Sequence, residues 1–264
     1  MAFTPFIDNL ALVEVLLLLA ATIFAYGGVM VYLAIRSDDL KGLTSILRGM
    51  SVPLGGLGVV TLSLALWGEM TWPFLVSDGL GGYNIFFWDV LVIFGILLLA
   101  YAIAMAWNVR LQYVGLFALV AGGVTCFYGW TGYTANPPFT EDPFKTFLLY
   151  LAFGVAGIAA FPASLIVDYY RSATEAHAAP FTSTLILGSR SLLRHATRGA
   201  QPVVAVGGEA VEERMKNPSY HVPIWAQLLL LAFPVLMGLA AIAALWYFGV
   251  TLPGHLGGGA GAAP

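Results

Sequence analysis

The sequence predicts an all-α polytopic membrane protein, a bundle of six transmembrane helices with a cytoplasmic amphipathic helix. Composition is the first reason: 59% of the 264 residues are hydrophobic and 9% are charged, whereas a soluble domain carries about 25% charged residues. The second reason is a set of apolar stretches, each long enough for the roughly 20 residues that cross a bilayer. The third is the way basic residues alternate between the segments that join these stretches. So few charges indicate a surface that faces lipid.

Hydropathy places the six spans in order along the chain. They are Leu10–Ile35, Ile46–Trp67, Ile85–Trp107, Leu111–Trp130, Phe147–Val167 and Pro223–Phe248. The chain before the first span lacks the basic region and the short apolar region of a cleavable signal, so we expect this span to be retained.

Charge predicts the orientation of these spans. Every lysine and arginine except Lys145 lies in the segments that join spans 1 and 2, 3 and 4, or 5 and 6, or, in the case of Arg48, in the first turn of the second span beside such a segment. Cytoplasmic loops of membrane proteins carry such an excess of basic residues. We therefore expect these segments in the cytoplasm and both termini outside the plasma membrane.

The chain divides into four predicted parts. Residues 1–170 form a five-helix core, 171–222 a cytoplasmic loop, 223–250 the sixth span and 251–264 a disordered tail. Within the loop, apolar residues cover one side of a candidate helix at Thr182–Arg198. Arg190, Arg194 and Arg198 recur on another side, as in a helix that lies on anionic headgroups. A docking site for a partner protein would have the same pattern.

Proline and small residues indicate how the spans pack. The run from Pro53 to Gly58 predicts a kink or a broken first turn in the second span. It fits either a half-helix that lines a cavity or, as we favour, close helix packing. Small residues three or four apart also predict tight contacts in the fourth and fifth spans, within one chain or between chains. They are Gly115, Ala118 and Gly122, and Ala152, Ala156 and Ala160 with Gly154 and Gly157.

Three carboxylates lie within or at the ends of spans, near the predicted outer surface. They are Glu14, Glu69 and Asp89. A carboxylate at membrane depth is costly unless it is neutral, paired or wet. If the helices bring the three together, they form a candidate ion or proton site; otherwise each is solvated in the headgroup zone. Asp168, at the inner end of the fifth span, is expected to anchor the interface or to pair with Arg171.

Aromatic residues crowd the same predicted surface. They are Trp67, Trp72, Tyr83, Phe86, Phe87, Trp88, Tyr128, Trp130 and Tyr133. A headgroup or quinone pocket would use such side chains, but the aromatic belt of a membrane protein also predicts them. We favour the belt.

The sequence offers no constellation for a cofactor, a metal or catalysis. None of the four histidines lies in a predicted span, which argues against a haem held between helices. Neither a metal-binding HExxH or CxxC pattern nor a Gly-x-Ser-x-Gly elbow occurs. The basic residues do not form a nucleic-acid footprint. We therefore predict no cofactor, no metal and no nucleic-acid partner.

Three motifs carry a resemblance to a known family. They are Phe87-Trp88-Asp89, Gln112-Tyr113-Val114-Gly115, and the run from Phe147 to Gly157. The chain from about Leu10 to Tyr170 resembles a family of uncharacterised multi-pass membrane proteins of archaea and bacteria, known only as a domain of unknown function. The resemblance implies a prokaryotic membrane and brings no reaction, cofactor or catalytic residue.

Two function classes follow from these observations. The favoured one is a non-catalytic membrane subunit or scaffold, which packs against other membrane subunits or its own copies through small-residue helix faces. The alternative is a channel or transporter for a small solute, ion or proton, with Asp89, Glu14 and Glu69 at an outer vestibule.

Overall fold

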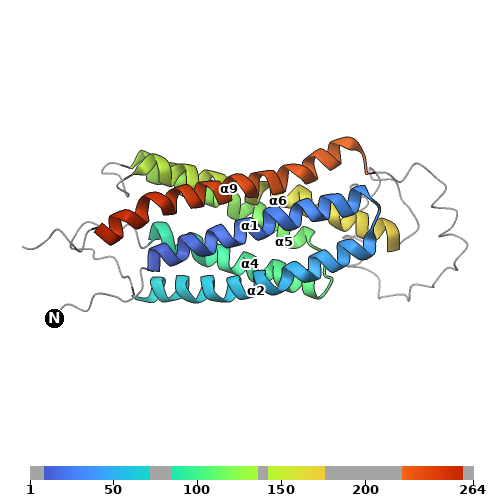
Figure 1. The fold of residues 1–264 in the computed structure, drawn as a ribbon, viewed down its shortest axis with the longest axis horizontal. Coiled ribbons are helices and arrows are strands. Elements are labelled where there is room, and N and C mark those ends of the chain that lie inside the picture. The colour runs from blue at the N-terminus through green and yellow to red at the C-terminus, as the bar shows by residue number, and fades with distance from the viewer. Residues whose placement is uncertain (1–8, 72–84, 136–141, 176–221, 258–264) are drawn as a thin grey trace, which may run out of the picture.

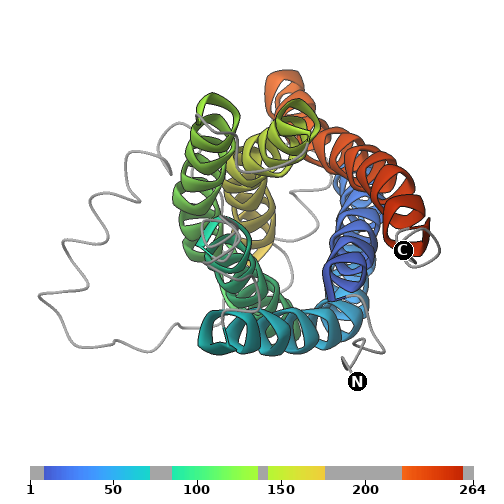
Figure 2. The same ribbon diagram turned by 90° about the vertical axis from the view of Figure 1, so that its left-hand side faces the viewer.

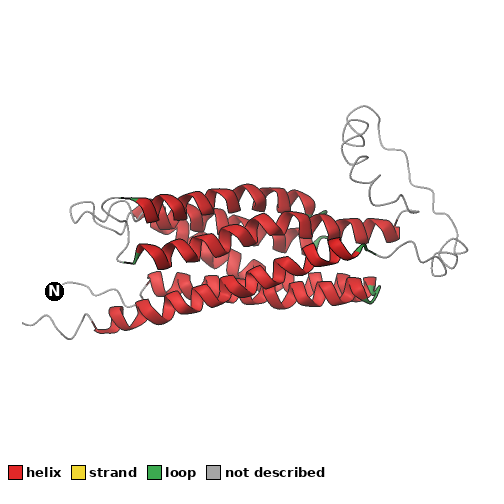
Figure 3. Ribbon diagram, turned by 90° about the horizontal axis from the view of Figure 1, so that it is seen from above, coloured by secondary structure: helices red, strands yellow, loops and turns green. Residues whose placement is uncertain are grey.

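The computed structural model describes residues 9–71, 85–135, 142–175 and 222–257, and this part of the chain is all-helical, without strands (Figures 1 and 3). The helices are α1 (Asn9–Arg36), α2 (Leu40–Thr71), η2 (Ile85–Asp89), α4 (Val90–Ala106), α5 (Gln112–Thr134), α6 (Pro143–Glu175) and α9 (Ile224–Gly257). The described residues contain six helices that are long and apolar enough to cross a membrane, with η2 and α4 forming one of them. The predicted six-helix architecture is confirmed.

The helices pack in chain order as a ring. Each contacts the next, from α1 through α2, α4, α5 and α6 to α9, and α9 returns to α1. Figure 2, which looks along the bundle, shows the helices arranged around a common centre. A ring of this kind turns one stripe of each helix toward the interior and leaves the opposite stripe for lipid.

Charge distinguishes the two ends of the bundle. At one end α1 passes into α2, α4 passes into α5, and α6 ends; we call this the basic end, and Arg36, Lys41, Arg110 and Arg171 lie there. At the other, acidic end, α1 begins and α9 ends (Figure 1). Among the described residues, the carboxylates at this end are Glu14, Glu69, Asp89 and Asp142.

The predicted tight contacts of small residues occur between α5 and α6, within the chain. Gly122 lies against the backbone of Gly154 and Gly157. A Cβ added to Gly115 would lie 2.8 Å from the Cβ of Ser164. Such close approach lets two backbones pack without intervening side chains, so the prediction of a tight contact is confirmed.

Helices α2 and α4 approach each other in the same way. A Cβ added to Gly58 would lie 2.9 Å from the amide nitrogen of Leu99, and one added to Gly95 would lie 2.8 Å from that of Leu62. Pro53 stands inside an unbroken helix that begins at Leu40. The predicted broken first turn is therefore wrong. The run from Pro53 to Gly58 instead contains Gly58, which packs against α4.

The helices extend beyond the stretches that hydropathy marks. Helix α6 continues to Glu175, past the predicted boundary at 170. Helix α9 continues to Gly257, so the assignment of residues 251–257 to a disordered tail is wrong. Hydropathy detects only the apolar middle of a span, whereas backbone hydrogen bonding continues through polar ends. The predicted amphipathic helix at 182–198 lies outside the described residues.

Candidate functional site

The site is organised by a π-helical turn, η2, at the start of the third span. Its residues Phe86, Phe87 and Trp88 are buried. The hydroxyl of Tyr150, on α6, donates a hydrogen bond of 2.6 Å to the carbonyl oxygen of Phe86, and the two rings stack 4.6 Å apart. A π turn widens a helix and is frequent at functional sites. Here it is fixed to α6 and ends at Asp89.

Trp88 joins this turn to α2. Its side chain is 1% exposed and packs with Val13, Ala65 and Leu91. Gly68 lies directly against the indole, and a Cβ at this position would overlap the ring. The absence of a side chain at Gly68 thus lets the end of α2 approach η2, which brings the neighbouring Glu69 close to Asp89.

Glu69, Asp89 and Tyr128 form what we call the acid cluster. The hydroxyl of Tyr128, on α5, donates to Asp89 Oδ2 at 2.7 Å. The side chains of Glu69 and Asp89 are within hydrogen-bonding reach of each other, and Glu69 Oε1 is a buried atom. A carboxylate has no hydrogen to donate, so a hydrogen bond between two carboxyl groups requires a proton on one of them.

No described basic residue serves the acid cluster as a counter-ion. Lys145, which lies at the same end, forms an ion pair with Asp142 and also lies over the ring of Trp246. Asp142 lies outside the membrane-spanning stretch, and its hydrogen bond with Lys145 lowers the pKa of its carboxyl group. Within the described ranges, no group of three or more His, Cys, Asp or Glu is placed to hold a metal ion.

Of the three predicted site residues, the structure brings Glu69 and Asp89 together. Glu14 is 3% exposed and lies in the wall of a cavity inside the ring of helices. Its neighbour Val13 packs on Trp88, so the cavity lies close to the acid cluster.

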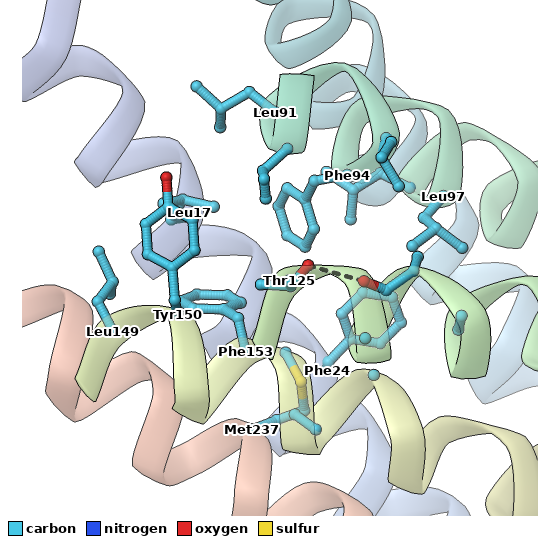
Figure 4. A pocket seen from close by; sticks show the side chains of 18 of the residues that line it. Leu17, Phe24, Leu91, Phe94, Leu97, Thr125, Leu149, Tyr150, Phe153 and Met237 are labelled. Carbon is cyan, nitrogen blue, oxygen red and sulfur yellow. Dashed lines mark hydrogen bonds between the residues drawn. The ribbon is translucent and has the colours of Figure 1, made fainter. Parts of the chain in front are cut away.

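The cavity has a volume of about 110 Å³. Every helix of the ring except α2 contributes to its wall, which is mostly aliphatic and aromatic. Figure 4 shows Phe24, Phe94, Tyr150 and Phe153 around it, with the Thr125 hydroxyl bonded to the carbonyl of Ala121 at 2.8 Å. The polar residues in the wall are Glu14, Thr125, Tyr101, Tyr150 and Tyr247.

A second, smaller cavity of about 50 Å³ lies toward the basic end. Phe24, Tyr101, Ala160 and Phe233 line both cavities. The hydroxyls of Tyr101 and Ser164 are 3.1 Å apart in its wall. The interior between the acid cluster and the basic end therefore holds two adjoining cavities with few polar groups.

Asp168 is the buried carboxylate of the basic end. It is 7% exposed and accepts a hydrogen bond of 2.7 Å from the amide of Gln112, the first residue of α5. Arg171 Nη1 lies 3.7 Å from its Oδ1, so the predicted ion pair is confirmed. A carboxylate at a helix N-terminus satisfies free amide groups and favours the helix dipole. This arrangement is structural.

The assignment of the aromatic residues to a membrane belt is wrong for some of these residues. Phe86, Phe87 and Trp88 are buried and build the site, because the π turn directs their side chains inward. Trp67, Trp130 and Tyr133 are exposed, as in a belt. Trp72 and Tyr83 lie outside the described residues.

Sequence reasoning missed the role of two tyrosines. From the sequence, Tyr128 fits the aromatic belt and Tyr150 is only part of an apolar motif. A hydroxyl on an apolar helix gives no sequence signal of its own. Yet the third and fourth spans form a helical hairpin whose outer ends are Asp89 and Tyr128, and this topology could have indicated their contact.

Comparison with known proteins identifies a family. No curated protein and no solved structure matches the chain. A family model matches residues 1–190, which include the acid cluster and every cavity residue outside α9. This match extends beyond the predicted resemblance at both ends and covers well over half of the chain. The chain therefore belongs to the family described as "Protein of unknown function (DUF981)".

Proposed function

We propose that this protein carries a proton or a small cation across the plasma membrane of a prokaryote, as a channel or transporter. The observation that supports this proposal is the contact between Glu69 and Asp89 within membrane-spanning helices. Two carboxyl groups with no described basic partner can take up a proton or a cation, whereas a structural carboxylate needs donors already in place.

The distribution of charge supports an orientation for this function. The basic end faces the cytoplasm, because basic residues gather on that side of membrane proteins. Both termini and the acid cluster then face outward. In this arrangement Arg190, Arg194 and Arg198 lie at the inner leaflet, where anionic headgroups bind them.

Proton or cation flux into vesicles that contain the purified protein tests the proposal. We expect Asp89→Asn to reduce the flux to that of protein-free vesicles, because an amide neither ionises nor shares a proton with Glu69. Asp142→Asn is the matched control: it makes the same change at the same end, outside the cluster. Equal flux in the wild type and in Asp89→Asn would refute a working role for Asp89.

A non-catalytic membrane subunit is the second candidate. The outer face of α2 supports it, because Gly49 and Gly56 face open space on either side of the exposed Pro53. A helix of another subunit, or of a second copy, could approach there closely. The small residues of α5 and α6 support it less, because they pack inside the chain.

Purification in a gentle detergent with mass spectrometry separates the two candidates. A stoichiometric partner subunit would favour the second and move the search for chemistry to that partner. A lone chain or a homo-oligomer that conducts ions would favour the first.

A further inference from the structure

We propose that the cavity inside the helix ring binds a small, neutral, apolar molecule of about the size of a single aromatic ring. This inference concerns the interior of the ring and does not depend on the proposed transport of protons or cations. The hydrogen bonds of the wall, its apolar side chains and its volume carry the inference in turn.

Two hydroxyl groups of the cavity wall donate to backbone carbonyls. Thr125 donates to the carbonyl oxygen of Ala121 at 2.8 Å, within α5. Tyr150 donates to the carbonyl oxygen of Phe86 at 2.6 Å and so joins α6 to η2. Each hydroxyl group has a single hydrogen to donate. Neither of the two is therefore left as a donor for water or a polar ligand.

The other polar groups of the wall also have partners within the protein. Two hydroxyls of α6 pair with tyrosines of the wall: Ser164 lies 3.1 Å from the hydroxyl of Tyr101, and Thr146 lies 3.3 Å from that of Tyr247. Glu14 likewise interacts within the protein. A buried water needs about two to four polar partners. A wall whose polar groups are already engaged therefore favours a dry cavity.

The rest of the wall is aliphatic and aromatic. Phe24, Phe94 and Phe153 line the cavity from three different helices, and Leu17 and Leu97 lie among them (Figure 4). The rings of Phe94 and Phe153 meet edge to face, with their centroids 5.7 Å apart. Such rings pack favourably against another aromatic ring or an aliphatic body. Burial of apolar surface is then the driving force for binding.

The volume limits the size of the ligand. The cavity measures about 110 Å³, and the second cavity, of about 50 Å³, adjoins it. A dry cavity of about 150 Å³ lined by Leu, Ile and Phe binds benzene or xenon. Drug-sized ligands need about 300 Å³ or more. The ligand is therefore no larger than a monocyclic aromatic molecule.

Fluorine NMR on the purified protein in lipid nanodiscs tests this assignment. The probe is fluorobenzene, and 4-fluorophenol is its counterpart with an added hydroxyl group. Nanodiscs without protein give the signal of the probe dissolved in lipid. We expect a further, saturable fluorobenzene signal that only the protein produces. We expect 4-fluorophenol to bind at least about tenfold more weakly, because a buried hydroxyl group without a free partner is costly. Equal binding of the two probes, or no protein-dependent signal, would overturn the proposal.

A filled cavity locates the site. Ala121→Leu places a larger side chain in the cavity and should abolish the protein-dependent signal. Val120→Leu, on the exposed side of the same helix, should preserve it. Equal binding by these two variants would overturn the assignment to this cavity.

An enlarged cavity decides the matter if Ala121→Leu does not fold. Leu97 lines the cavity from α4. We expect Leu97→Ala to bind 1-fluoronaphthalene, whose two fused rings exceed the space in the wild type. Ile96→Ala is the matched control, because it removes an isomeric side chain from the exposed side of α4 and leaves the cavity unchanged. Equal binding of 1-fluoronaphthalene by the wild type and both variants, or by none of them, would overturn the proposal.

Discussion

The two ends of the bundle each hold a partly or fully buried aspartate, but the partners of the two carboxylates differ. Asp168, at the basic end, accepts the amide of Gln112 and pairs with Arg171. Asp89, at the acidic end, accepts the hydroxyl of Tyr128 and faces the carboxyl group of Glu69. Donors surround the first carboxylate, whereas a second acid accompanies the other. The chemistry of the partners therefore distinguishes a structural carboxylate from a candidate working one, and burial alone does not.

This comparison predicts a large loss of stability at the basic end. Asp168→Ala should lower the free energy of unfolding by about 3 kcal/mol, because it leaves the Gln112 amide without its acceptor and removes the carboxylate paired with Arg171. Arg171 keeps its hydrogen bonds to Asn108 and Val109. Asp89→Ala should cost about 1 kcal/mol, since it removes one hydrogen bond from Tyr128. Detergent-induced unfolding in mixed micelles measures both.

Asp168→Asn is the control for this pair of variants, because its amide oxygen can still accept the Gln112 hydrogen bond. We expect it to recover part of the loss in Asp168→Ala. A loss in Asp89→Ala as large as that in Asp168→Ala would contradict the distinction between the two ends.

A second prediction concerns how the acidic end is assembled. Gly68→Ala should lower the free energy of unfolding by about 2 kcal/mol, because its Cβ would overlap the buried indole of Trp88. The displaced ring should also carry Asp89 away from Glu69 and reduce flux. Gly56→Ala makes the same change on α2 where no atom lies within 4 Å of the added Cβ.

The control variant, Gly56→Ala, should not lower the free energy of unfolding. Alanine is favoured over glycine in a helix by up to about 1 kcal/mol, so we expect Gly56→Ala to be neutral or stabilising. If both variants are equally stable, Trp88 does not depend on close packing against Gly68.

A third prediction compares two tyrosines that donate to aspartates at opposite ends. Tyr128→Phe removes the donor to Asp89, and Tyr170→Phe removes the donor to Asp38. Each should cost about 1 kcal/mol of stability. Only Tyr128→Phe should change flux, because only Tyr128 contacts the acid cluster. Flux that falls equally in both variants would indicate a general effect of lost stability.

The sequence predicted the fold and two members of the acid cluster for physical reasons. Membrane spans are recognisable because bilayer thickness sets their length and apolarity. Glu69 and Asp89 stand out because a charge at membrane depth is rare. Their location at the same end follows from the topology, because Glu69 lies at the end of one span and Asp89 at the start of the next. The small residues of α5 and α6 predicted close packing in the same way.

The details of the site were not predictable from sequence. The π turn at Ile85–Asp89 has no periodic signature in an apolar run, so the sequence pattern places Trp88 in the membrane belt although the side chain is buried. The place of Glu14 in the cavity wall depends on how six helices close into a ring. That closure depends on contacts between residues far apart in the chain, which local patterns do not encode.

The smallest effect is expected for Asp142, a carboxylate at the acidic end that has a lysine as partner. The hydrogen bond with Lys145 lowers the pKa of Asp142 in the folded protein. Its stabilising contribution is therefore fully present above the unfolded-state pKa and is lost as the pH falls through the lower folded-state pKa. The pair is solvent-accessible, so the contribution is small.

Asp142→Asn isolates this contribution, because asparagine can still accept the amide of Lys145 at the start of α6, as Asp142 Oδ1 does at 3.3 Å. We expect the unfolding midpoints of the wild type and the variant to differ little near neutral pH and to converge at acidic pH. Flux should be unchanged, since the acid cluster is intact. A loss of flux in Asp142→Asn would show that flux depends on negative charge at the acidic end in general, and the contact between Glu69 and Asp89 would no longer distinguish the two ends.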